Sequence, residues 1–246
     1  MGIKKETGFT IIETMLFLAV SGMLVTIILV GSGVAIGQQR YRDSVSSLKS
    51  YIQQQYSDTV NVSNDRNANW TCNSTAHVSE IEGAGGIPRG TSDCVILGRF
   101  VTVDATGTKL STANVVGVRQ ANAESKASDV EELQENYTLS ISPIAPETAD
   151  VSWGAQVVRP KSTTPMPISL LIIRSPLSGS IVTFTADNVQ TDLNAMVTTA
   201  NMTQKDLCVN AETGSFVGSR MAVRIDAFAT NQGGIEVPPE SAGVCD

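Results

Sequence analysis

The chain has 246 residues and a mass of 26.0 kDa, with 41% hydrophobic and 17% charged residues. This composition excludes a wholly disordered chain and predicts one large domain or two small ones. Because 17 basic residues face 24 acidic ones, the net charge is −7 and a surface built to hold nucleic-acid phosphates is not expected.

The first predicted element is an apolar helix near the N-terminus. No charged residue lies between Glu13 and Arg40, and residues 14–39 are mostly Leu, Ile, Val, Met, Ala and Gly. At about 1.5 Å per residue this helix would be roughly 39 Å long, against a hydrocarbon thickness of about 30 Å. The sequence therefore predicts a membrane span over 14–39. A secretory signal peptide is a weaker alternative, because its apolar run is ordinarily about 7–15 residues long.

Glu13 lies at the edge of this apolar run. A carboxylate at the bilayer centre costs about 2.5–3.5 kcal/mol on the lenient insertion scale, and less near the edge. Two interpretations remain open. Glu13 is solvated at the interface, or it pairs with a positive charge from another chain.

The residues around Glu13 carry a family resemblance. The run from Lys4 to Thr14 reads KKETGFTIIET. It has a short hydrophilic leader with lysines, Gly8 before Phe9, and Glu13 as the fifth residue after Gly8. This run resembles the leader junction and first helix of the type IV prepilins and of the related pseudopilins of type II secretion and DNA uptake. The resemblance covers about the first 60 residues.

The resemblance implies how the chain is processed and where it resides. Residues 1–8 would be a leader, which a prepilin peptidase removes between Gly8 and Phe9 before methylating the new amino group of Phe9. Glu13 of one subunit would then neutralise the Phe9 amine of a neighbour. The implied partners are other pilin subunits, the peptidase, an inner-membrane assembly platform and membrane lipid. The N-terminus would lie in the cytoplasm, with the head outside and the assembled filament at the cell surface.

Beyond the span, the helix is predicted to continue as an amphipathic stem over 40–60, completing one element over 9–60. Its apolar residues recur at spacings of three or four, which places them on one helical face. They are Tyr41, Val45, Leu48, Ile52 and Tyr56. Such a face requires a cover, so we expect the stem to pack beneath a globular head.

The head, over 61–246, is predicted to be rich in antiparallel strands, which makes the fold α+β. Two apolar-rich runs, 94–104 and 109–119, flank a short Gly-containing turn and predict a hairpin. Ser128 and Glu131 have capping-box spacing and predict a short helix ending near Asn136. Further strands are expected over 137–144, 151–158, 168–174 and 180–186, and a second hairpin over 206–211 and 215–227.

The four cysteines lack a C-x-x-C pair, so a zinc site is not expected. Four cysteines allow three disulfide connectivities. Of these we favour Cys72–Cys94 and Cys208–Cys245, the second of which resembles the C-terminal disulfide loop of many pilins. The alternative is four buried thiols in a reducing compartment.

Candidate catalytic residues are few, and we expect no enzymatic activity, metal or cofactor. The single histidine, His77, lies in a polar stretch, and the sequence has no G-x-S-x-G elbow. Ser46 and Lys49 have the spacing of a Ser–Lys pair, but they lie on the amphipathic stem.

Charge gives a further expectation about partners. From Asp43 onward there are 13 basic and 22 acidic residues, which gives 13 − 22 = −9 and disfavours a nucleic-acid partner. Arg220 and Arg224 suggest either a small basic site or ordinary solvent-facing positions.

The expected function is that of a structural filament subunit, major or minor. The alternatives are a membrane-anchored adhesin or binding protein that does not polymerise and, more remotely, an anchored hydrolase.

Overall fold

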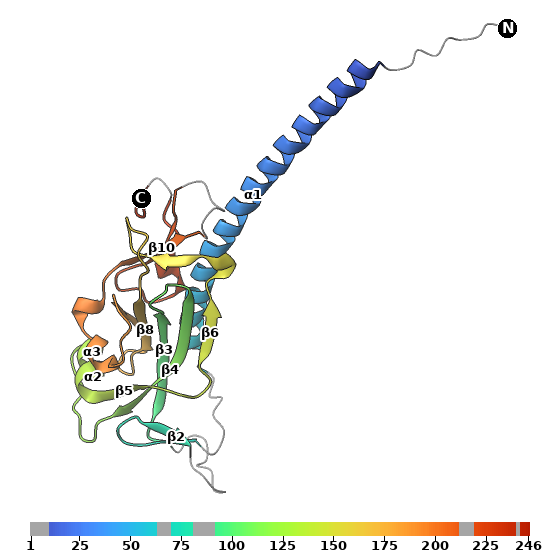
Figure 1. The fold of residues 1–246 in the computed structure, drawn as a ribbon. Helices are drawn as coiled ribbons and strands as arrows, with labels where there is room; N and C mark the ends of the chain where they lie inside the picture. Colours follow the sequence, from blue (N-terminus) through green and yellow to red (C-terminus); the bar gives the residue numbers. More distant parts are fainter. Residues whose placement is uncertain (1–9, 63–69, 81–91, 212–218, 240–241) are drawn as a thin grey trace, which may run out of the picture.

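The computed structural model describes residues 10–62, 70–80, 92–211, 219–239 and 242–246. A long helix, α1 (Ile11–Val60), projects from a globular head built mainly of antiparallel strands (Figure 1). The predicted α+β class, with an N-terminal helix and a β-rich head, is confirmed.

The helix α1 has two halves with different surroundings. Its buried residues begin only at Gly37, so the preceding apolar half lies outside the head. In the second half, the five apolar residues expected on one face are each at most 3% exposed. They contact the core of the head, as the spacing predicted.

The larger sheet has six strands in the order β5-β4-β3-β8-β9, with β6 pairing β4, and every pairing is antiparallel. The strands are β3 (Val95–Val103), β4 (Lys109–Arg119), β5 (Tyr137–Ile141), β6 (Glu147–Asp150), β8 (Ile168–Arg174) and β9 (Ile181–Ala186). The predicted first hairpin is β3 and β4.

The larger sheet is covered on both faces, which explains the continuous apolar run of β8. Leu170 and Ile172 face the core cluster that contains the stem of α1. Leu171 and Ile173 face a second cluster, which contains residues of α2 (Asp129–Asn136) and α3 (Leu193–Met196). A strand buried on both faces is apolar at successive positions instead of alternating. The predicted Ser128 cap of α2 is present, because the Glu131 amide donates to its hydroxyl.

A smaller sheet of four strands has the order β12-β11-β10-β7. Its strands are β7 (Gln156–Val158), β10 (Lys205–Asn210), β11 (Ala222–Ile225) and β12 (Ile235–Glu236). A separate hairpin joins β1 (Trp70–Cys72) to β2 (Val78–Glu80). Three short 3₁₀ helices complete the described chain: η1 (Ser152–Gly154), η2 (Thr199–Asn201) and η3 (Gln232–Gly234).

Two predicted strands differ from the structure. The strand expected over 151–158 is wrong in its first half, because Trp153 (φ 59°) and Gly154 (φ 65°) adopt left-handed conformations that no strand contains. η1 therefore precedes β7. The strand expected over 137–144 ends at Ile141. The turn of the second predicted hairpin falls in 212–218, outside the described residues, but β10 and β11 do pair antiparallel.

Candidate functional site

Of the residues named by the prepilin motif, Glu13 lies at the start of α1. Gly8 and Phe9 lie outside the described residues, and the described helix begins directly after them with Thr10 as its N-cap. The Glu13 amide donates to the Thr10 hydroxyl at 3.3 Å. The Thr10 amide and hydroxyl both donate to the same Glu13 carboxylate oxygen at 3.2 Å. This capping box turns the carboxylate toward the N-terminal end of the helix, where the helix dipole favours negative charge.

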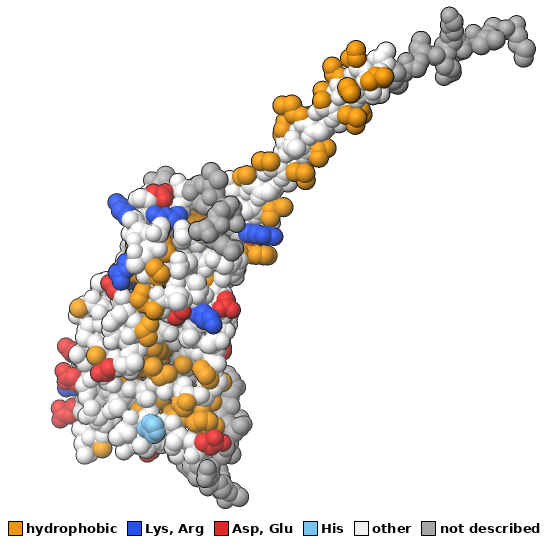
Figure 2. All heavy atoms as spheres, viewed as in Figure 1, with side chains coloured by type: hydrophobic (Ala, Val, Ile, Leu, Met, Phe, Trp, Pro, Cys, Tyr) orange, Lys and Arg blue, Asp and Glu red, His pale blue; other side chains and the backbone are white. Residues whose placement is uncertain are grey.

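The apolar half of α1 is uncovered in the single chain. Its most apolar stretch has a mean hydropathy of 2.3, and none of that stretch is buried. Leu16 and Ile28, for example, are each 64% exposed. Figure 2 shows apolar side chains along both edges of the visible face of this part of the helix. Within the described residues it is the one helix long and apolar enough to cross a membrane. An exposed apolar surface of this extent is typical of a membrane or protein contact.

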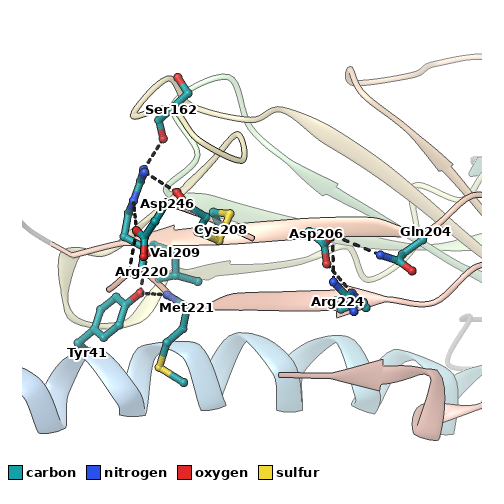
Figure 3. The surroundings of a disulfide bond; sticks show 11 residues. Tyr41, Ser162, Gln204, Asp206, Cys208, Val209, Arg220, Met221, Arg224 and Asp246 are labelled. Carbon is teal, nitrogen blue, oxygen red and sulfur yellow. Dashed lines mark hydrogen bonds and ion pairs between the residues drawn. A yellow bond between two sulfur atoms is a disulfide. The ribbon is translucent and has the colours of Figure 1, made fainter. Parts of the chain in front are cut away.

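Tyr41 fastens the stem to the smaller sheet. Its hydroxyl donates to the Val209 carbonyl at 2.9 Å and accepts a hydrogen bond from the Met221 amide (Figure 3). The Val209 amide donates directly to the Met221 carbonyl at 2.9 Å. In a regular antiparallel pair both N–H···O bonds would be direct. Here the tyrosine hydroxyl stands between the Met221 amide and the Val209 carbonyl and replaces the second direct bond. The helix is thereby hydrogen-bonded to β10 and to the residue that precedes β11.

Further polar contacts fasten α1 to the larger sheet. The Tyr56 hydroxyl lies 3.0 Å from that of Thr183, and burial raises the pKa of Tyr56 to about 12. Nearer the end of the helix, Asp58 forms an ion pair with Arg99 at 3.2 Å. The stem is therefore bound to both sheets along its length, and α1 and the head form one unit from Tyr41 onward.

Both favoured disulfides are present. Cys72 pairs with Cys94 and Cys208 with Cys245, with Cα–Cα distances of 6.0 and 5.7 Å. The second joins the C-terminal segment to β10. Arg220 fastens that segment further, because its guanidinium donates to the Ser162 and Cys245 carbonyls (Figure 3).

The small basic site considered for Arg220 and Arg224 does not form. Arg224 lies 2.7 Å from Asp206 and 3.7 Å from Glu236, so carboxylates offset its charge. Arg220 precedes β11 and is engaged by the C-terminal segment, with Asp246 at 3.8 Å. Neither arginine is an ordinary solvent-facing position, because both side chains are about 20% exposed.

A buried carboxylate that the sequence did not reveal is Glu132 of α2, which is 3% exposed. It accepts hydrogen bonds from the Lys126 amide at 2.9 Å, from Asn136 at 2.7 Å and from Arg119 at 3.2 Å. Burial alone would raise its pKa, but these three donors outweigh burial and lower the pKa of the carboxyl. The network holds the loop after β4 against α2, so its role is structural.

The candidates for catalysis lie on two different segments of the chain. His77 is exposed just before β2, while Ser46 and Lys49 lie on the stem. Among the described residues no group of three or more His, Cys, Asp or Glu side chains is placed to hold a metal ion.

No protein-family model, curated protein or solved structure matches this chain. The structure itself has a pilin-like architecture: a long apolar N-terminal helix, partly embedded in a β-rich head that is closed by a C-terminal disulfide.

Proposed function

We propose that the chain is a structural subunit of a type IV pilus or of a related secretion-type filament. It would be made as a prepilin, trimmed after Gly8, stored in the cytoplasmic membrane with its N-terminus inside, and packed helix to helix with other subunits. In this role it has no enzymatic activity. Whether it is a major or a minor subunit follows from its abundance in the filament.

The observation that carries the proposal is the division of α1. One half is apolar on all sides and uncovered, whereas the other half is locked into the head by hydrogen bonds and an apolar face. A membrane anchor needs only an apolar span of about 20 residues. A rigid connection between span and head is needed when packing of the spans must set the positions of the heads.

Glu13 gives the packing its register. Its carboxylate lies at the N-terminal end of the apolar stretch and, among the described residues, forms no ion pair. An isolated charge in a low-dielectric helix bundle is costly, and its pairing with a neighbour's terminal amine rewards one axial position over others.

The assembly test uses cells that carry a type IV assembly system and measures the subunit in sheared surface fibres. We expect Glu13→Ala to lower the assembled fraction at least about tenfold, because it removes the charge that sets the register. The matched control is Thr10→Ala, which breaks the capping box but keeps the carboxylate, and it should assemble within about twofold of wild type. Normal assembly of Glu13→Ala, or equal loss in both variants, would exclude the proposed role of Glu13.

The processing test separates a filament subunit from a membrane-anchored binding protein. Gly8→Leu should leave the leader attached and abolish assembly, whereas Gly2→Leu, a matched change away from the junction, should be trimmed normally. If the untrimmed Gly8→Leu chain still supports adhesion or binding at the wild-type level, the alternative of a membrane-anchored binding protein that does not polymerise would be favoured.

A further inference from the structure

A cavity of about 180 Å³ lies where α1 leaves the head. Its helical wall is formed by Gly37, Arg40, Tyr41 and Ser44, and Trp153 and Ala155 also line it. The described lining therefore includes one cation and no carboxylate, although the chain as a whole has a net charge of −7.

Arg40 offers hydrogen-bond donors at this cavity. Its guanidinium lies 5.1 Å from the centroid of the Trp153 ring, a distance at which the cation and the aromatic face attract each other. Arg40 is exposed and, within the described part of the chain, forms no ion pair. No hydrogen bond of the Arg40 guanidinium is observed among the described residues, so its N–H groups are available to a ligand. A phosphate matches the edge of a guanidinium with two parallel hydrogen bonds.

Ser44 is a second, independent indication of a ligand. The residue is fully buried and lines the cavity, yet its hydroxyl has no hydrogen-bond partner among the described residues. A buried hydroxyl without a partner costs free energy. Helical Ser and Thr usually donate to a carbonyl of the preceding turn, as Thr59 does to Gln55 at 2.8 Å. Ser44 does not, so an unused donor is buried in the wall of the cavity.

Trp153 is held at the cavity by a strained backbone. Its φ of 59° and ψ of 32° lie in the left-handed region, which bulky L-residues rarely adopt. The residue is also 54% exposed. Tryptophan is enriched at membrane–water interfaces, where its ring meets the lipid headgroups.

The position of the cavity along α1 agrees with a location at the membrane–water interface. Ile11 and Arg40 are separated by 29 residues, or about 44 Å of helix at about 1.5 Å per residue. A bilayer including its headgroups is about 40–45 Å thick. If α1 begins at one face of the membrane, Arg40 and Trp153 reach the headgroup layer of the other. Figure 2 shows basic side chains, with an acidic one among them, at the end of the head from which the apolar helix projects.

We propose that this cavity binds the phosphodiester headgroup of an anionic membrane lipid. Arg40 pairs with the phosphate oxygens, Ser44 donates to the headgroup, and the Trp153 ring packs against its glycerol carbons. The bound lipid fixes the head at the membrane surface before assembly. This inference rests on the membrane placement in the proposed function, but not on filament formation.

The test uses the full chain in a nonionic detergent, with Trp70→Phe so that Trp153 is the remaining tryptophan of the two in the sequence. Its fluorescence is followed during titration with short-chain phosphatidylglycerol. Two further titrations use the matching diacylglycerol, which lacks phosphate, and inorganic phosphate. We expect a saturable change with phosphatidylglycerol and none with the other two at the same concentrations.

Variants identify the residues. Arg40→Gln should weaken phosphatidylglycerol binding at least about tenfold, because it removes a charge-assisted bidentate contact. The matched control is Arg42→Gln, which makes the same charge change at an exposed residue outside the cavity lining and should change binding less than about twofold. Ser44→Ala should weaken binding about threefold or more while leaving the melting temperature of the lipid-free chain unchanged or higher, since it removes an unpaired buried hydroxyl.

Three results would overturn the proposal. Equal effects of Arg40→Gln and Arg42→Gln would mean general electrostatic attraction to the lipid. A response to diacylglycerol as strong as to phosphatidylglycerol would mean an apolar site, and an equal response to inorganic phosphate would mean a small-anion site. None of these results bears on trimming or assembly, which the experiments on Gly8 and Glu13 test separately.

Discussion

The bridge made by Tyr41 gives a quantitative prediction about how the helix is joined to the head. Tyr41→Phe keeps the ring in the core but removes the hydroxyl between the Val209 carbonyl and the Met221 amide. Both backbone groups would be left without that partner. At about 1–1.5 kcal/mol for each lost hydrogen bond, we expect the free energy of unfolding to fall by roughly 2–3 kcal/mol. For a chain of this size that corresponds to a melting temperature lower by about 4–12 °C.

The assay is denaturant unfolding of the detergent-solubilised full chain, followed by near-ultraviolet circular dichroism. Tyr137→Phe is the matched control, because Tyr137 is 8% exposed and no hydrogen bond of its hydroxyl is observed among the described residues. We expect it to change the free energy of unfolding by less than about 0.5 kcal/mol. If Tyr41→Phe were as mild as the control, the two strands would be closing the bond directly and the bridging hydroxyl would contribute nothing.

Three further predictions concern the head. Glu132→Gln should be less stable than wild type at neutral pH. Because the pKa of Glu132 is lowered from 4.5, its contribution is present above about that pH and disappears as the pH falls through the lowered value, so the two stability curves should converge in acid. Replacing Cys208 and Cys245 by Ala should cost about 3–4 kcal/mol of unfolding free energy, measured without reductant; the chain-entropy estimate fails if the loss is below about 1 kcal/mol. Gly98→Ala should lower the melting temperature strongly, because its Cβ would overlap the Ile172 carbonyl oxygen, and an unchanged melting temperature would contradict that close approach.

Local patterns in the sequence predicted much of the fold. The spacing of apolar residues located the buried face of α1, and apolar-rich runs around a Gly-containing turn located β3 and β4 to within a residue or so. The cap at Ser128 located the start of α2. Each of these signals comes from residues close together in the chain, so it does not depend on the tertiary structure.

Pairing between distant segments could not be predicted in the same way. The strands β1, β2, β6 and β12 were missed because they are two to four residues long and lack a clear alternating pattern. β6, for example, forms only by pairing with β4. The apolar residues around Trp153 resembled a strand, although its left-handed backbone excludes one.

The same distinction applies to the site. The prepilin resemblance points to Glu13 from the sequence alone. The capping box of Glu13 with Thr10 was not predicted, although their T-x-x-E spacing is the signal that indicates it. By contrast, Arg40 and Trp153 are far apart in the chain, and only the packing of η1 against α1 brings them together. The bridging role of Tyr41 depends likewise on where β10 and β11 meet the stem.

The intact mass and N-terminal residue of the protein, taken from membranes and from sheared surface fibres, test the proposed function most directly. We predict a chain that begins at Phe9, carries one added methyl group on its terminal amine, and lacks four hydrogens because both disulfides have formed. A chain recovered from fibres or membranes that still begins at Met1, with all four thiols free, would contradict processing, export and assembly together.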